Sequence, residues 1–163
     1  MQEWNEINSD EDIDGFMKQT HGMHDTILVS ANYTMGCGKV EGGMIVQGKE
    51  SDYVLRLLFD SDWTERLEMV FTGVRHFNFC GFRDNYMNDI FGCYLSFHTE
   101  LMGRTRDDRL IVWADGSFSP VMYCSKIDLK DCDSSFVIAD DLKWRFINEE
   151  EVSNACKENN PLP

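Results

Sequence analysis

The fold is decided by the stretch YVLRLLFDSDWTERLEMVF, residues 53–71, which contains two runs of alternating apolar and polar residues. Apolar side chains recur at every second position of each run, as Tyr53, Leu55, Leu57 and Phe59 and then as Leu67, Met69 and Phe71. Successive side chains of a β-strand point to opposite faces, so this spacing places the apolar set on one face. A short polar segment joins the runs, and they therefore predict an antiparallel pair of strands with one buried face.

Strand-like runs also lie on both sides of this stretch. The segments expected to form strands are residues 26–35, 39–48, 93–98, 110–114, 118–124, 136–139 and 142–147. Residues 36–38 are expected to form a turn, Gly42-Gly43 a bulge within a strand, and residues 104–109 a charged connection. Asp115-Gly116 favours a two-residue hairpin turn between the strands that flank it, because both positions accept a positive φ.

A helix is predicted over residues 10–20, before the first strand. Ser9 can cap this helix, since a serine hydroxyl accepts a hydrogen bond from a backbone N–H of the first helical turn. Ile13, Phe16 and Met17 follow at the i, i+3 and i+4 spacing of one helix face. The helix is therefore expected to dock on the sheet through this apolar stripe.

These elements predict a mainly β (α+β) fold in a single domain, residues 1–158, followed by a tail at 159–163. A single antiparallel sheet that is curled, or folded into a sandwich or half-barrel, would bury the alternating faces. One or two further short helices are expected, after Asp84 and after Asn148. A chain of 163 residues can bury a core of its own without disulfides or a structural metal.

The chain carries 29 acidic and 15 basic residues, which gives a formal net charge of −14. This charge argues against nucleic acid and against anionic membranes as partners, because both require a basic surface. No apolar run is long enough to span a membrane, and the polar start of the chain lacks the features of a secretory signal. We therefore expect a cytoplasmic protein whose acidity either keeps it in solution or attracts a basic protein partner.

No motif in the chain completes a recognisable active site. GxSxG, HExxH and a phosphate-binding loop do not occur, and no cofactor is predicted. The six cysteines form no CxxC pair, so we expect free, mostly buried thiols in a reducing compartment. Thiol chemistry with a histidine remains an alternative that the sequence does not constrain.

The segment His21-Gly22-Met23-His24-Asp25 places two of the chain's four histidines and a carboxylate directly before a predicted strand. Imidazole and carboxylate groups are zinc ligands, but Gly22 interrupts the helix that would bring both rings to one side. The alternative is a structural junction, in which Asp25 closes the turn and His24 seats the strand. His98 could join His24 only through strand pairing. We predict no metal, and we keep these histidines and Asp25 as candidate binding residues.

Trp63 follows a predicted turn and is a further candidate binding residue, because tryptophan is enriched at the hot spots of interfaces. Packing in or beside the core is the alternative for this side chain. Trp113 and Trp144 lie within strand patterns, and both are expected in the core.

Several short segments follow one another in a suggestive order. The acidic N-terminal helix is followed by His24-Asp25-Thr26-Ile27, by FTGVRHF at residues 71–77 and by IADDLKW at residues 138–144. This order resembles small uncharacterised bacterial β-rich proteins, some of which are predicted immunity proteins of bacterial toxin systems. The resemblance covers residues 24–147, and it implies a binding protein rather than an enzyme.

The favoured hypothesis is a non-enzymatic, acidic protein-binding module of bacterial origin, immunity-like and directed at a basic toxin domain. One alternative is a metal- or thiol-dependent enzyme centred on His24 and Asp25. Another is a carrier of a small apolar ligand, with its cavity inside a curled sheet. The oligomeric state does not follow from the sequence.

Overall fold

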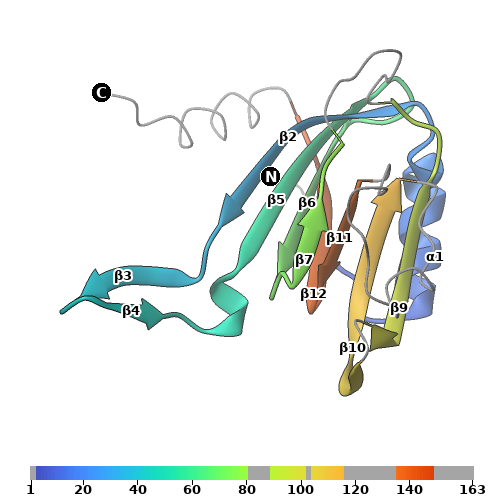
Figure 1. Ribbon diagram of the computed structural model, residues 1–163. Helices are drawn as coiled ribbons and strands as arrows, with labels where there is room; N and C mark the ends of the chain where they lie inside the picture. Colours follow the sequence, from blue (N-terminus) through green and yellow to red (C-terminus); the bar gives the residue numbers. More distant parts are fainter. Residues whose placement is uncertain (1–2, 81–88, 102–103, 116–134, 149–163) are drawn as a thin grey trace, which may run out of the picture.

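A computed structural model describes residues 3–80, 89–101, 104–115 and 135–148 of the chain (Figure 1). It confirms the mainly β fold, with antiparallel sheets that do not close into a barrel and with the helix α1 (Asp10–Gln19) beside them. Of the described strands, six form one sheet in the order β1 (Asn5–Glu6), β12 (Asp141–Ile147), β6 (Arg66–Thr72), β5 (Val54–Ser61), β2 (Thr26–Thr34) and β8 (Asp89–Ile90).

Four strands form a second sheet in the order β7 (His76–Asn78), β11 (Phe136–Ala139), β10 (Arg104–Asp115) and β9 (Cys93–Leu101). The remaining described strands, β3 (Cys37–Glu41) and β4 (Met44–Gln47), pair with each other. Two 3₁₀ turns complete the described elements, η1 (His21–Met23) after α1 and η2 (Glu50–Asp52) before β5.

The alternating runs form the strand pair that they predict. In the β5–β6 ladder Leu57 lies opposite Met69, and both side chains are fully buried. The core that they enter lies between the two sheets, where the rings of Phe59 and Trp113 meet at 5.5 Å. Burying an aromatic or aliphatic side chain of this size stabilises a fold by about 1.5–3 kcal/mol. The pattern of residues 53–71 thus places the largest stabilising contributions at the centre of the molecule.

The predicted helix is confirmed together with its cap. The hydroxyl of Ser9 accepts a hydrogen bond of 3.2 Å from the backbone N–H of Asp12. Phe16 is fully buried on the inner face of the helix, and its ring packs edge-on against Trp144 at 5.3 Å. The core positions predicted for Trp113 and Trp144 are also confirmed.

The segment 36–48 differs from its prediction. Residues 37–41 and 44–47 are two strands of a hairpin, rather than a turn followed by one bulged strand. Gly42 and Gly43 form its turn with φ of 58° and 80°. Two successive positive φ values are the signature of a hairpin turn, which an interpretation of the glycines as a bulge overlooks.

The charged segment 104–109 also differs, because it is the first half of β10 rather than a connection. β10 pairs with β9 along one edge and with β11 along the other over residues 111–114. A strand has two edges, so the predicted hairpin between 110–114 and 118–124 is not formed at these positions. Residues 118–124 themselves, and the helices expected after Asp84 and after Asn148, lie outside the described residues.

The outer face of the first sheet is more buried than its polar residues predict. Glu68 on β6 is almost completely buried, although it alternates with the core residues Leu67 and Met69. Its carboxylate accepts hydrogen bonds from Arg56 and, at 2.7 Å, from Nε of Arg145. Two guanidinium groups compensate the buried charge, so a polar residue at an alternate position does not always mark a solvated face.

Candidate protein-binding surface

Strand register gathers several predicted site residues at one end of the β2–β5 pair. The first residue of β2, Thr26, lies opposite Ser61 on β5 and opposite Ile90 on β8. The residues just beyond these three strand ends are therefore neighbours, although they are far apart in the chain. His24 and Asp25, Trp63, and Phe91 occupy these positions, and we call these four residues the Trp63 surface.

Asp25 is the centre of the Trp63 surface. Its Oδ2 accepts a hydrogen bond of 3.1 Å from the indole Nε1 of Trp63 and lies 3.0 Å from Nδ1 of His24. The ring of His24 meets the ring of Phe91 edge-on, with 6.3 Å between centroids. The other carboxylate oxygen of Asp25 has no hydrogen-bond partner among the described residues, so it can accept one from a bound molecule.

The backbone that carries His24 and Asp25 is held in an uncommon conformation. Positive φ values occur at His21 (53°), Met23 (58°) and Asp25 (52°), in addition to Gly22. Non-glycine residues adopt this region at a cost, and they do so where the surrounding structure fixes them. Met23 is that fixed point, since its side chain is buried and its sulfur accepts a hydrogen bond from Trp113 Nε1 at 3.3 Å.

Two large aromatic side chains of this surface are exposed. Trp63 is 61% exposed and Phe91 is 71% exposed, whereas most large aromatic residues of the described chain lie in the core. The alternative in which Trp63 packs in or beside the core is therefore wrong, and its side chain is exposed, as a binding residue requires. Exposed aromatic side chains with a fixed orientation are typical of interface anchors.

The surroundings of these rings are acidic. Three acidic residues flank Trp63 along the chain, Asp60, Asp62 and Glu65. Asp89 lies two residues before Phe91. Arg66 is the nearest base in the sequence, and it pairs with Asp60 at 3.2 Å. The Trp63 surface therefore combines aromatic rings with a local excess of carboxylates.

The structure brings three of the predicted site residues together and leaves two apart. His24 and Trp63 each contact Asp25, whereas His21 is exposed on η1 without a side-chain hydrogen bond among the described residues. His98 lies on β9 in the second sheet, where its Nε2 is 2.7 Å from the hydroxyl of Tyr94. Burial lowers the pKa of His98 below its ordinary value. Among the described residues, the ring of His24 contacts Asp25 and Phe91, and the ring of His98 contacts Tyr94.

The catalytic alternatives gain no support from the described residues. No group of three or more His, Cys, Asp or Glu side chains among them is arranged to hold a metal ion. Burial raises the pKa of the Cys93 thiol to about 12, which keeps it protonated and unreactive near neutral pH. Cys80 is half-buried, and the side chains of the other cysteines lie outside the described part of the structure.

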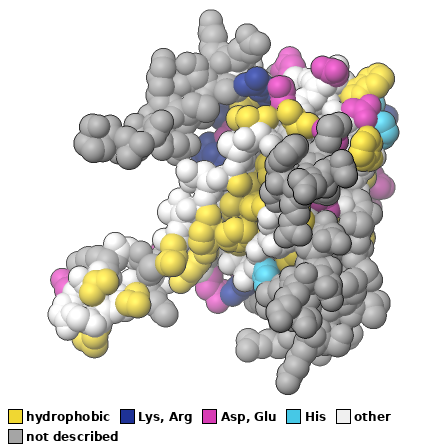
Figure 2. Space-filling model, turned by 45° about the horizontal axis from the view of Figure 1, so that its top comes forward, with side chains coloured by type: hydrophobic (Ala, Val, Ile, Leu, Met, Phe, Trp, Pro, Cys, Tyr) yellow, Lys and Arg dark blue, Asp and Glu magenta, His cyan; other side chains and the backbone are white. Residues whose placement is uncertain are grey.

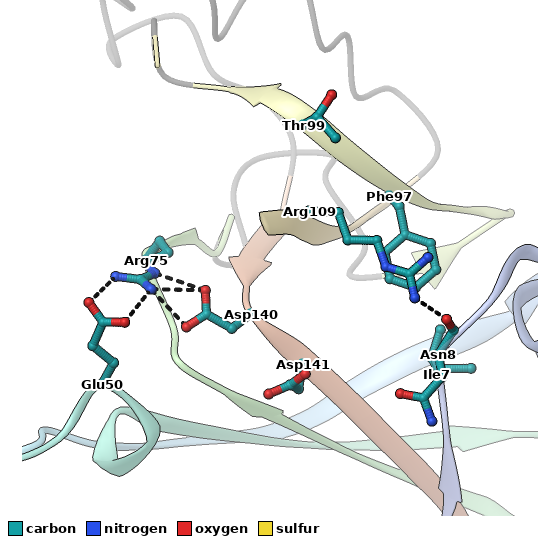
Figure 3. Close-up of a pocket in the computed structure, with 9 residues that line it drawn as sticks. All are labelled: Ile7, Asn8, Glu50, Arg75, Phe97, Thr99, Arg109, Asp140 and Asp141. Carbon is teal, nitrogen blue, oxygen red and sulfur yellow. Dashed lines mark hydrogen bonds and ion pairs between the residues drawn. The ribbon is translucent and has the colours of Figure 1, made fainter. Parts of the chain in front are cut away.

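A polar cleft of about 660 Å³ lies at a different place, between the two sheets and the turn η2 (Figure 3). Arg75 donates hydrogen bonds to Glu50 at 2.9 and 3.1 Å and to both carboxylate oxygens of Asp140 at 2.8 and 2.9 Å. The two carboxylates raise the pKa of Arg75 further above its ordinary value. On the opposite wall, Arg109 stacks on Phe97 at 3.8 Å. Since Arg75 is fully engaged, its role here is to join η2 to the body of the protein.

The polar lining of this cleft also bears on the carrier hypothesis. An apolar ligand requires a cavity lined mainly by hydrophobic side chains. In the described residues the space between the sheets is filled by side chains such as Phe59 and Trp113. A small apolar ligand therefore finds no support in this part of the structure.

The sequence alone does not distinguish Phe91 or Arg75 as site residues. Phe91 lies between the turn signals Asp89 and Gly92, and nothing in its neighbours distinguishes an exposed phenylalanine from a buried one. Arg75 lies within the FTGVRHF segment, but its two carboxylate partners come from residues 25 and 65 positions away. Only the strand order brings these groups together.

Comparison with protein-family models, with curated proteins and with solved structures found no match to this chain. Within the described residues, no helix has the length and apolar character needed to cross a membrane. The function must therefore be inferred from the surface itself.

Proposed function

We propose that this protein is a non-catalytic binding module that captures a basic protein at the Trp63 surface. The observation that carries the proposal is the exposed Trp63 ring, held by Asp25 in an acidic environment. An exposed aromatic ring beside a carboxylate is suited to a guanidinium or ammonium group, which stacks on the ring and pairs with the carboxylate.

The net charge supports this choice of partner. A chain with a formal charge of −14 attracts basic proteins over a distance and repels acidic ones. Attraction of this kind raises the association rate. An aromatic side chain that the partner covers in the complex slows dissociation. The acidic surface and the aromatic ring thus contribute to different steps of the same binding event.

The fixed orientation of Trp63 supports the role of an anchor. A side chain that is already held by a hydrogen bond loses less conformational entropy when a partner packs against it. The indole N–H is satisfied by Asp25, so covering the ring leaves no unpaired donor. The second oxygen of Asp25 then accepts from the basic group of the partner.

A basic toxin domain is the kind of partner that we favour, and the protein would then act as a bacterial cytoplasmic immunity protein. This narrower proposal rests on the order of short segments in residues 24–147, which resembles small uncharacterised bacterial β-rich proteins, some of them predicted immunity proteins, and on the net charge. Binding of a basic protein at the Trp63 surface does not depend on the partner being a toxin.

The first experiment is affinity capture from the producing cells with the wild type and with Trp63→Ala, followed by identification and purification of the captured protein. We expect a basic protein that the wild type retains and Trp63→Ala loses. In titration calorimetry, Trp63→Ala should weaken binding about tenfold to a hundredfold, as is usual for a hot-spot residue. Binding should also weaken steeply as salt is raised.

The matched control is Met44→Ala, which removes another exposed large apolar side chain, on strand β4 of the hairpin that lies beyond the opposite end of the β2–β5 pair. This variant should bind the partner like the wild type. An acidic or neutral partner, or a basic partner that binds Trp63→Ala with unchanged affinity, would overturn the proposal.

A further inference from the structure

A two-stranded hairpin, which we call the arm (residues 37–47), projects from the body of the protein (Figure 1). Val40 lies opposite Ile45 in its ladder, and β3 and β4 pair with no other described strand. It leaves the body at the end of the β2–β5 pair that is remote from Trp63. The arm is therefore a separate surface from the one proposed to bind a basic protein.

The arm exposes large apolar side chains. Val40 and Met44 are each 72% exposed and Ile45 is 67% exposed. Figure 2 shows hydrophobic side chains on the arm and a band of them on the strands that lead to it. An isolated two-stranded hairpin is only marginally stable in water, and three or more strands are needed for stable pairing. The arm therefore lacks the additional strands that would stabilise it.

The base of the arm is built to hold it in place. The backbone N–H of Gly48 donates a hydrogen bond of 2.6 Å to the carbonyl of Gly36, so the two segments at the base of the hairpin cross closely there. A Cβ atom at Gly48 would collide with that carbonyl, which explains the glycine. Directly after the crossing, Glu50 is bound to Arg75, and Arg75 is bound to Asp140 (Figure 3). The arm is thus anchored to both sheets at its base.

The charge of the arm differs from that of the rest of the chain. Residues 26–48, which include β2 and the whole arm, contain one acid, Glu41, and one base, Lys39. The formal charge of −14 therefore lies entirely outside this segment. Two copies of so acidic a protein repel each other, except where they meet through a surface without net charge.

We propose that the arm is a dimer interface and that its occupant is the arm of a second copy. In this dimer β4 pairs with β4 of the second copy, antiparallel and across a two-fold axis, so that the two hairpins form one four-stranded sheet. The axis passes midway between the two copies of Ile45, because residues that lie directly opposite each other in an antiparallel pair point to the same face, so each Ile45 lies opposite Ile45 of the other copy. Such an interface is self-complementary and closes at two copies.

The sequence of β4 favours this strand over β3. Residues 44–47 are MIVQ, without a charge, and Ile45 and Val46 are β-branched residues that favour strand pairing. β3 contains both Lys39 and Glu41, and charged residues are a common means of protecting an exposed edge. Pairing through β4 leaves the charged edge facing solvent.

The test is the mass of the wild-type protein in solution, measured by sedimentation velocity and light scattering across the micromolar range. We expect a reversible dimer, of twice the chain mass of 18.9 kDa. Ile45→Glu should raise the dissociation constant about tenfold or more, because it places like charges near the axis of an acidic dimer. Ile45→Val should leave the dimer intact. At concentrations below the dissociation constant, where both proteins are monomers, the melting temperature should stay the same in both variants, since the side chain is exposed there.

Two further measurements distinguish this dimer from the capture of a basic partner. Trp63→Ala, at the other end of β2–β5, should dimerise like the wild type. Added salt should strengthen the dimer by screening repulsion, whereas it should weaken binding of a basic protein. A monomeric wild type throughout the micromolar range, oligomers larger than two, or an undisturbed dimer in Ile45→Glu would each overturn the proposal.

Discussion

The indole Nε1 of Trp63 donates a hydrogen bond of 3.1 Å to Oδ2 of Asp25, which lies 38 residues earlier in the chain. This bond joins the end of β5 to the residue before β2. It fixes an exposed aromatic ring beside the carboxylate of Asp25, whose backbone has a positive φ of 52°. The ring and the charge are therefore presented together, in one orientation, before any partner arrives.

Replacement of Asp25 should separate the two roles of its carboxylate. Asp25→Asn keeps an oxygen that can accept from the indole but removes the charge, whereas Asp25→Ala removes both. We expect the indole N–H of Trp63 to exchange with solvent much faster in Asp25→Ala and to change little in Asp25→Asn. Proton NMR of the indole resonances, assigned with Trp63→Phe, measures this. Equal exchange rates in the wild type and Asp25→Ala would show that the hydrogen bond does not form in solution.

The positive φ values predict opposite effects for two glycine substitutions in η1. His21 is exposed, so His21→Gly relieves backbone strain and loses no core contact. We expect it to raise the free energy of unfolding by about 0.5–1 kcal/mol, whereas His21→Ala should give no such gain. Met23→Gly relieves the same strain but empties a core position, and it should destabilise by about 2–4 kcal/mol. Urea unfolding of the three variants tests these signs, and a loss of stability in His21→Gly contradicts the role given to strain.

Glu68 offers a test of the buried ion pairs on the outer face of the first sheet. Glu68→Ala leaves Arg56 and Arg145 facing each other without a compensating carboxylate. We expect the free energy of unfolding to fall by about 2–4 kcal/mol, in the range found when one partner of a buried pair is removed. Glu65→Ala, at an exposed position nearby, serves as the control and should change stability little. A similar effect of both substitutions would mean that the carboxylate of Glu68 is not coupled to the arginines.

Local patterns account for much of the fold. The alternation at Leu55, Leu57 and Phe59 predicts β5 correctly because a sheet buries one face, and Ser9 predicts the start of α1 because its hydroxyl satisfies a helix N–H. Both signals act over a few residues. The buried face of β5 and the cap of α1 can therefore be predicted without knowing the strand order.

The remaining features depend on contacts between distant segments. The charged residues of 104–109 do not prevent strand formation, because β9 supplies a partner for Arg104 and Thr105. Glu68 is buried because Arg145, 77 residues later, reaches it. The Trp63 surface is assembled by the register of β2 with β5 and β8. The sequence shows that His24 and Asp25 are adjacent, but not that they join Trp63 and Phe91.

His98 predicts how stability depends on pH. Burial lowers the pKa of His98 and of His76 in the folded protein, so the unfolded chain binds protons more readily than the folded one. The stability that these neutral rings provide is present above the ordinary histidine pKa of 6.5, and it is lost as the pH falls through and below that value. We expect the free energy of unfolding to decrease between about pH 7 and pH 5, and His98→Gln to make this decrease shallower while keeping a hydrogen-bonding group beside Tyr94. Urea unfolding at several pH values measures both slopes, and the same slope for the wild type and His98→Gln would show that His98 titrates alike in the folded and unfolded chains.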